Sequence, residues 1–162
     1  MSKLTRRTFV GICATAPLMG NALAADDVIE IGMHNRDPDD KKKRNVFSPR
    51  VVRIKAGEKV RFAAADKGHN SASSKGMIPE GVDPWKGKIN EEIELTFDKP
   101  GVYGYECTPH VSIGMVGLII VEGDGMLDNL EAAQGRKQRG KAKKVWKEIW
   151  AEAEEKGLLN QA

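Results

Sequence analysis

The sequence predicts a mainly β fold, a small Greek-key sandwich or barrel, followed by two C-terminal helices. The chain has 162 residues, of which 40% are hydrophobic, so its size suits one globular domain rather than a large multidomain enzyme. Between Val28 and Val121 apolar and polar residues alternate in several short segments, which is the pattern of half-buried strands. From Met126 onward the apolar residues recur at helical spacing instead.

Six segments are predicted to be strands, and turn residues separate them. The clearest strand contains Ile93, Leu95 and Phe97, which alternate with polar residues. The pairs Ala56-Gly57 and Pro100-Gly101 mark turns. Six or more strands in about a hundred residues are typical of a Greek-key sandwich or barrel. The six predicted strands are residues 28–33, 50–55, 58–65, 91–97, 102–107 and 115–121.

The remaining segments predict a long connection and a helical tail. Residues 66–90 have no strand pattern but contain several apolar residues, which favours an ordered, functional connection. In the tail, Leu127, Leu130 and Ala133 precede Gly135, and a second helix has apolar residues at helical spacing from residue 142 to 153. Residues 136–147 include seven basic side chains. A solvated helix face is the favoured interpretation of this charge run, ahead of a docking site.

The first 24 residues predict an export signal. A charged start is followed by a weakly apolar run over residues 11–20 and by small residues up to Ala24 and Ala25, which is the pattern of a cleavable signal peptide. Adjacent Arg6 and Arg7 indicate the twin-arginine form. A membrane-spanning helix needs about 20 apolar residues, more than this run provides. We therefore expect cleavage after Ala24 or Ala25, a β domain over residues 26–124 and a helical extension over residues 125–162.

The charge balance argues against a nucleic-acid partner. The chain carries 26 Lys and Arg against 23 Asp and Glu, but Lys3, Arg6 and Arg7 belong to the predicted signal. Without these three the balance is 23 against 23, whereas a nucleic-acid binder usually has a clear basic excess. The predicted mature protein is a monomer without a membrane anchor.

Cysteine use points to a metal. Cys13 lies in the predicted signal, so Cys107 is the one cysteine left after export to an oxidising compartment. A lone thiol there is either buried and inert or occupied as a metal ligand.

The residues that follow this cysteine have the spacing Cys-x2-His-x4-Met, formed by Cys107, His110 and Met115. Thiolate, imidazole and a weak thioether together select copper, and the blue-copper site adds a second histidine. His69 is the better candidate because it comes just after the predicted strand 58–65, whose end can meet the 107–115 loop at one pole of the fold. His34 follows the first strand and lies beside a charged loop. Structural histidines, a core methionine and a zinc site are the alternatives. The four side chains together favour copper.

Several stretches of the chain resemble one family of proteins. They are Asp66-Lys67-Gly68-His69-Asn70, Lys75-Gly76-Met77-Ile78-Pro79-Glu80-Gly81, Lys88-Ile89-Asn90-Glu91, Pro100-Gly101-Val102-Tyr103-Gly104, Cys107-Thr108-Pro109-His110 and Gly114-Met115-Val116-Gly117. In these stretches, and in its two predicted C-terminal helices, the chain resembles the pseudoazurins, which are bacterial periplasmic cupredoxins. Plastocyanins share the Cys-x2-His-x4-Met spacing but neither the long loop nor the helical tail.

The resemblance implies a cupredoxin sandwich of about eight strands with one copper ion, cycling between Cu(II) and Cu(I), on His69, Cys107, His110 and Met115. It implies a periplasmic electron carrier, not an enzyme, that serves redox proteins such as copper nitrite reductase or a c-type cytochrome in transient complexes. A copper storage or delivery protein and a small copper redox enzyme are the alternative functions.

Neighbouring residues receive supporting roles in this interpretation. Asn70 is expected to hydrogen-bond to the Cys107 loop, with Thr108 and Pro109 as further outer residues of the site. Around a surface-proximal His110 we expect an apolar partner-docking patch bordered by lysines. Its apolar members are Met77, Ile78, Pro79, Pro109 and Ile113, with Met33 as a further candidate, and its lysines are Lys67, Lys75, Lys86 and Lys88.

Three segments depart from the family pattern. Residues 36–45 form a longer and more charged loop, Glu106 replaces a lysine before the ligand cysteine, and Val111-Ser112-Ile113 replaces a more aromatic, glycine-rich stretch. These differences leave the predicted ligands intact but leave the identity of the partner open.

Overall fold

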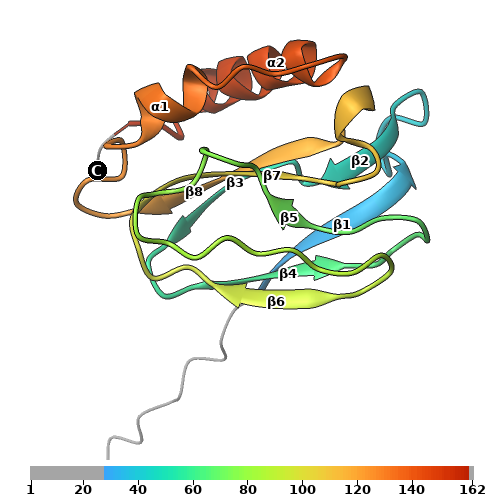
Figure 1. Ribbon diagram of the computed structural model, residues 1–162, viewed down its shortest axis with the longest axis horizontal. Helices are drawn as coiled ribbons and strands as arrows, with labels where there is room; N and C mark the ends of the chain where they lie inside the picture. The colour runs from blue at the N-terminus through green and yellow to red at the C-terminus, as the bar shows by residue number, and fades with distance from the viewer. Residues whose placement is uncertain (1–27, 161–162) are drawn as a thin grey trace, which may run out of the picture.

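Two four-stranded sheets pack face to face in the computed structural model, which describes residues 28–160. The helical tail covers the outer face of one sheet (Figure 1). The export signal predicted over residues 1–24 lies outside the described residues, as does its cleavage point.

The first sheet has the order β2-β1-β4-β6. Its central strands β1 and β4 run parallel, with Gly32 opposite Ala63, while both edge strands are antiparallel to their neighbours. The parallel pair brings the end of β4 beside the middle of β1. The strands are β1 Val28–Arg36, β2 Arg44–Ser48, β4 Lys59–Ala63 and β6 Ile93–Thr96.

The second sheet has the order β3-β8-β7-β5. Strands β7 and β8 form its long antiparallel centre, and β3 pairs parallel with β8. The short β5 pairs with the end of β7, so that Ala72 lies opposite Glu106. The strands are β3 Val51–Lys55, β5 Ala72–Ser73, β7 Gly101–Glu106 and β8 Val116–Glu122.

Aromatic rings fill the space between the sheets. The ring of Tyr105 meets those of Phe47 and Phe62 edge-on, at centroid distances of 4.8 and 5.0 Å. Ile31 and Ile119 complete this part of the core. Edge-to-face contacts and full burial hold the rings in fixed positions, which gives the site at the end of the sandwich a rigid base.

A second core lies between the outer face of the second sheet and the helices α1 (Leu130–Gln134) and α2 (Ala142–Glu155). Trp146 and Ile149 of α2 pack there with Leu118 and Ile120. Because the sheet is buried on both faces, six successive residues of β8 are buried and the alternation is lost. No helix within residues 28–160 is long and apolar enough to cross a membrane.

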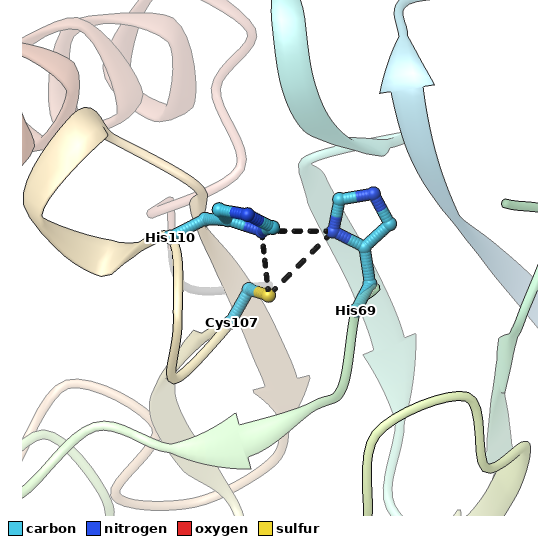
Figure 2. A group of neighbouring side chains, drawn as sticks. All are labelled: His69, Cys107 and His110. Carbon is cyan, nitrogen blue, oxygen red and sulfur yellow. Dashed lines mark hydrogen bonds between the residues drawn. The ribbon is translucent and has the colours of Figure 1, made fainter. Parts of the chain in front are cut away.

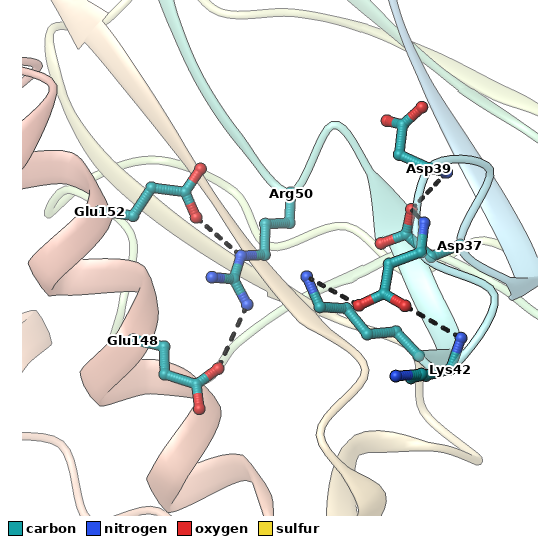
Figure 3. Close-up of polar contacts among 8 residues, drawn as sticks. Asp37, Asp39, Lys42, Arg50, Glu148 and Glu152 are labelled. Carbon is teal, nitrogen blue, oxygen red and sulfur yellow. Dashed lines mark hydrogen bonds and ion pairs between the residues drawn. The ribbon is translucent and has the colours of Figure 1, made fainter.

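An arginine from the sandwich fixes α2 from one side. The guanidinium of Arg50 lies 2.8 Å from Glu152 and 3.5 Å from Glu148 (Figure 3). The two carboxylates are one helical turn apart, so a single arginine binds two successive turns.

The prediction of a mainly β sandwich with about eight strands and two C-terminal helices is confirmed. Each of the six predicted strands is present. Strands β2 and β5 were missed. Strand β2 begins at the end of the predicted loop 36–45, and β5 lies within the predicted connection 66–90.

The charged segment 36–45 is a β-hairpin rather than a plain loop. Strand β1 continues to Arg36, which pairs with Arg44 of β2. The Asp37 carboxylate closes the turn by accepting hydrogen bonds from the N–H groups of Asp39 and Asp40, at 2.9 and 3.2 Å. Backbone hydrogen bonds between β1 and β2 form this hairpin. Because it does not depend on a buried apolar face, its charged sequence shows no alternation of apolar and polar residues.

Candidate metal centre

Three predicted ligands meet at one end of the sandwich, where strands of both sheets stop. His69 follows β4, Cys107 directly follows β7, and His110 precedes the short 3-10 helix η1 (Val111–Ile113). The Cys107–Met115 loop is tight. The N–H of His110 donates to the Cys107 carbonyl at 3.0 Å, and the N–H of Met115 donates to the His110 carbonyl at 3.1 Å. The loop therefore presents Cys107 and His110 side by side.

The donor atoms of the three side chains form a small triangle (Figure 2). Cys107 Sγ lies 3.7 Å from His69 Nδ1 and 3.5 Å from His110 Nδ1, and the two Nδ1 atoms are 3.1 Å apart. Cys107 and His69 are fully buried, while His110 is half-buried. Within the described part of the chain this is the one group of three or more His, Cys and acidic side chains with the spacing of a metal site.

Asn35 orients the first histidine. Its side-chain carbonyl lies 3.0 Å from His69 Nε2, so that nitrogen carries the ring proton and Nδ1 keeps its lone pair for a metal. The N–H of Asn35 in turn donates to the Asp66 carboxylate at 2.8 Å. Asn35 was not among the predicted site residues. The parallel pairing of β1 and β4 brings it to His69, and strand order is the signal that could have found it.

Asn70 ties the two ligand-bearing segments together, as expected. Its side-chain carbonyl accepts the N–H of Thr108 at 2.8 Å, and its amide donates to Thr108 Oγ1 at 3.1 Å and to the Gly87 carbonyl at 2.9 Å. Asn70 is buried, whereas Thr108 and Pro109 are exposed. The segment of His69 and the loop of Cys107 thus share one buried amide.

Burial favours the neutral form of both inner ligands. It lowers the pKa of His69, and the neighbouring His110 lowers it further. Burial also raises the pKa of the Cys107 thiol, an effect that the backbone N–H groups of Asn70 and His110 partly offset. Without a metal, these side chains are therefore held as imidazole and thiol near neutral pH.

The donor set fits copper. One sulfur and two imidazole nitrogens are the ligands of a trigonal blue-copper site. Nitrogens 3.1 Å apart have the spacing of two donors that each lie about 2 Å from a shared ion. Both Nδ1 atoms face Cys107 Sγ (Figure 2), so one ion can contact all three atoms.

Met115, the predicted fourth ligand, is fully buried in the same core cluster as Cys107. Its carbonyl accepts the N–H of Cys107 at 3.0 Å, which places the two residues side by side where β7 ends and β8 begins. The role of Met115 as a weak axial ligand stays a prediction.

The expected docking patch is only partly exposed. Lys67, Lys75, Lys86 and Lys88 are exposed, Ile113 is 43% exposed and Ile78 is half-buried. The prediction that Met77, Pro79 and Met33 lie at the surface is wrong. Met77 packs under the helices and accepts a hydrogen bond from Gln138 at 3.1 Å, Pro79 packs against Gly101, and Met33 belongs to the core between the sheets.

Comparisons with known proteins agree with this geometry. Residues 37–122 match the model of a family described as copper binding proteins, plastocyanin/azurin family. A pseudoazurin from Methylorubrum extorquens is 42% identical over 125 residues, which are 77% of each chain. A solved pseudoazurin structure from Sinorhizobium meliloti superposes with a TM-score of 0.72 at 48% identity, over 78% of this chain and 96% of that one. Another, from Methylobacterium extorquens, gives 0.71 at 40% identity, over 78% and 98%.

Proposed function

Because the chain belongs to the plastocyanin/azurin family of copper-binding proteins, and within it to the pseudoazurins, we propose that it carries single electrons between redox proteins of the periplasm. It is an electron carrier rather than an enzyme, with one copper ion as its cofactor. The triangle of Cys107 Sγ and two histidine Nδ1 atoms is the observation that carries this proposal.

His69, Cys107 and His110 are the proposed equatorial ligands, with Met115 as the weak fourth. Bound copper supplies a change between two oxidation states. The protein keeps the donors in one arrangement through the hydrogen bonds of Asn35 to His69 and of Asn70 to the Cys107 loop. A fixed donor arrangement keeps the structural rearrangement that accompanies electron transfer small.

His110 is the proposed electron exit. Its side chain is half-buried while the other two donors are fully buried, so a partner can approach the site most closely through this imidazole. Exposed Ile113 lies three residues further along the same loop. The exposed lysines 67, 75, 86 and 88 are proposed to guide acidic partners to this face by raising the association rate.

The proposed acceptor is a copper nitrite reductase, and a c-type cytochrome is the alternative partner. The complex is proposed to be transient, because a carrier must release each partner quickly. The carrier itself is proposed to be a monomer. A storage or delivery role is disfavoured because two of the three donors are fully buried, whereas exchange of copper needs accessible ligands.

Residues 1–24 are proposed to be a twin-arginine signal, removed after Ala24 or Ala25, ahead of the copper domain at 26–124 and the helical extension at 125–162. Replacing Arg6 and Arg7 by lysine tests the first part. The processed protein is expected to disappear from the periplasmic fraction, and unchanged export of the double variant would contradict a twin-arginine signal.

Absorption spectroscopy and voltammetry of the copper-loaded protein test the carrier function. We expect an intense blue band from Cys107 and a reversible one-electron couple, both lost in Cys107→Ser. A colourless copper complex, or catalytic turnover of nitrite or oxygen, would refute the carrier. Stopped-flow mixing of the reduced protein with copper nitrite reductase then tests the partner separately, because a working couple without reaction would exclude only that enzyme.

A further inference from the structure

A groove runs between residues 133–139, where α1 ends and the chain turns, and helix α2. It is far in sequence from the metal ligands. It encloses about 560 Å³, which lies within the usual range of about 300–1,000 Å³ for ligand pockets. Trp146 and Trp150 belong to its wall and stack on each other, with ring centroids 5.5 Å apart. Trp146 is buried and Trp150 is half-buried, so Trp150 provides most of the aromatic surface that a ligand can reach.

Cationic side chains surround this aromatic surface. No carboxylate lines the groove, and none within residues 28–160 lies within 4.0 Å of any of its cationic groups. Such a concentration of unpaired charge is complementary to an anionic ligand. The five cationic residues are Arg136, Lys137, Arg139, Lys143 and Lys147.

The opposite side of α2 is arranged differently. There Lys144 lies 3.9 Å from Glu148, and Lys156 lies 2.7 Å from Glu152. Both glutamates also face Arg50 of the sandwich (Figure 3). One helix thus has a side on which its charges pair with each other and a side on which positive charge is left unpaired. All seven basic residues of 136–147 are exposed, which agrees with the predicted solvated face, and the charge left unpaired on one side keeps open the docking site weighed as its alternative.

Helix α2, which forms one wall of the groove, is attached to the metal-ligand loop. The N–H of Lys141, at the start of α2, donates to the carbonyl of Ser112 in η1 at 2.9 Å. Gly114 lies against Val145, where an added Cβ would be 2.7 Å from the valine side chain. The first turn of the helix that forms one wall of the groove is therefore fixed to the loop that contains His110.

We propose that this groove is a docking site for an acidic peptide segment of a protein partner, one that also carries an apolar side chain. Carboxylates of the segment pair with the arginines and lysines of the rim, where a guanidinium binds a carboxylate in bidentate fashion. The apolar side chain packs on Trp150. That the partner is a redox protein rests on the proposed function, whereas the docking of an acidic segment does not.

A titration with a defined probe tests the proposal. The probe is the acetylated and amidated octapeptide Glu-Glu-Leu-Glu-Glu-Leu-Glu-Glu, added at low salt to the ¹⁵N-labelled, Cu(I)-loaded mature protein. We expect amide shifts in residues 133–150 and in the indole signals of Trp146 and Trp150. In the double variant Lys143→Gln/Lys147→Gln the affinity is expected to fall about tenfold, as the loss of two exposed ion pairs implies.

The matched control removes two lysines from the other side of the same helix. Lys144→Gln/Lys156→Gln changes the net charge equally but is expected to weaken binding less than about twofold. Equal losses in the two double variants would overturn the proposal, because binding would then follow net charge alone. Shifts confined to the lysines around His110 would overturn it as well.

Two further probes separate other anions from a peptide. Binding to vesicles that contain phosphatidylglycerol but not to the octapeptide would assign the groove to a membrane, and saturation by inorganic phosphate alone would assign it to a small anion. Either result would overturn the proposal. After oxidation of the same samples to Cu(II), their blue band and reversible couple report on the electron carrier independently, so its failure is distinguishable from failure of the groove.

Discussion

Asn70 is expected to hold the two halves of the metal centre together, and Asn70→Ala tests this role. The side chain is buried and makes three hydrogen bonds, two to Thr108 and one to the carbonyl of Gly87. Alanine removes all three. It leaves the Gly87 carbonyl and the Thr108 N–H without their partner at the point where the His69 segment meets the Cys107 loop.

The magnitude follows from the number of bonds. A hydrogen bond in a protein contributes about 0.5–1.5 kcal/mol net, and a buried group left unpaired costs about 1–3 kcal/mol. Three lost bonds therefore predict a decrease of about 2–4 kcal/mol in the free energy of unfolding. Copper affinity is expected to fall about 10- to 100-fold, the usual cost of removing an outer-shell partner.

Urea unfolding of the apoprotein, followed by circular dichroism, measures the first quantity, and competition with a copper chelator measures the second. Thr108→Val is the control, because it removes the Oγ1 acceptor and keeps the backbone N–H that donates to Asn70. Its cost is expected to be about 0.5–1 kcal/mol, since it loses one partly exposed bond. If Asn70→Ala costs no more than the control, or leaves copper affinity unchanged, the proposed bridge does not stabilise the site.

Three more predictions concern the thiol ligand, the surface lysines and the core between the sheets. Because burial raises the pKa of the Cys107 thiol, a metal must displace the thiol proton when it binds, so the affinity for Zn²⁺ is expected to rise about tenfold per pH unit up to that pKa. Calorimetry in two buffers should detect one released proton. An affinity that does not depend on pH would contradict this expectation. Lys67→Glu/Lys86→Glu is expected to slow electron delivery to an acidic partner about tenfold at low salt and to flatten the salt dependence, and a stopped-flow rate that stays the same would place docking elsewhere. Gly117→Ala puts a Cβ into the ring of Tyr105 and is expected to cost at least about 1–3 kcal/mol in thermal unfolding, so an unchanged melting temperature would show that the ring can move.

Alternation along the chain was sufficient to predict the strands whose two faces differ. In β6, Ile93 and Leu95 point toward the core while their neighbours are exposed. The same signal is absent from the two missed strands. Strand β5 has two residues, which is too short for a pattern, and β2 is held by backbone pairing to β1 in a charged hairpin. Pairing of this kind depends on where another strand lies, which local composition does not encode.

The ligand residues could be predicted because cysteine and histidine are rare in this chain. The residues that surround the ligands could not, because which residues lie there depends on the order and direction of the strands. One cysteine, one histidine and one methionine within nine residues were visible in the sequence. Asn35 reaches His69 only because β1 and β4 run parallel. Met77 was misplaced for a related reason, since its burial depends on how the helical tail covers the second sheet.

The site joins the two sheets, and this has a consequence for stability. Asn35 and His69 come from the end of the first sheet, and Cys107 and His110 from the connection between β7 and β8 of the second. An ion bound to His69, Cys107 and His110 links the sheets at that end, and the unfolded chain cannot offer the same set. Binding to the native state alone adds about 4 kcal/mol to the free energy of unfolding at a thousandfold excess of free metal over its dissociation constant. Opening of the sandwich at this end and loss of the ion are therefore one coupled event, so the metal-loaded protein should resist local opening most strongly where the ligands lie.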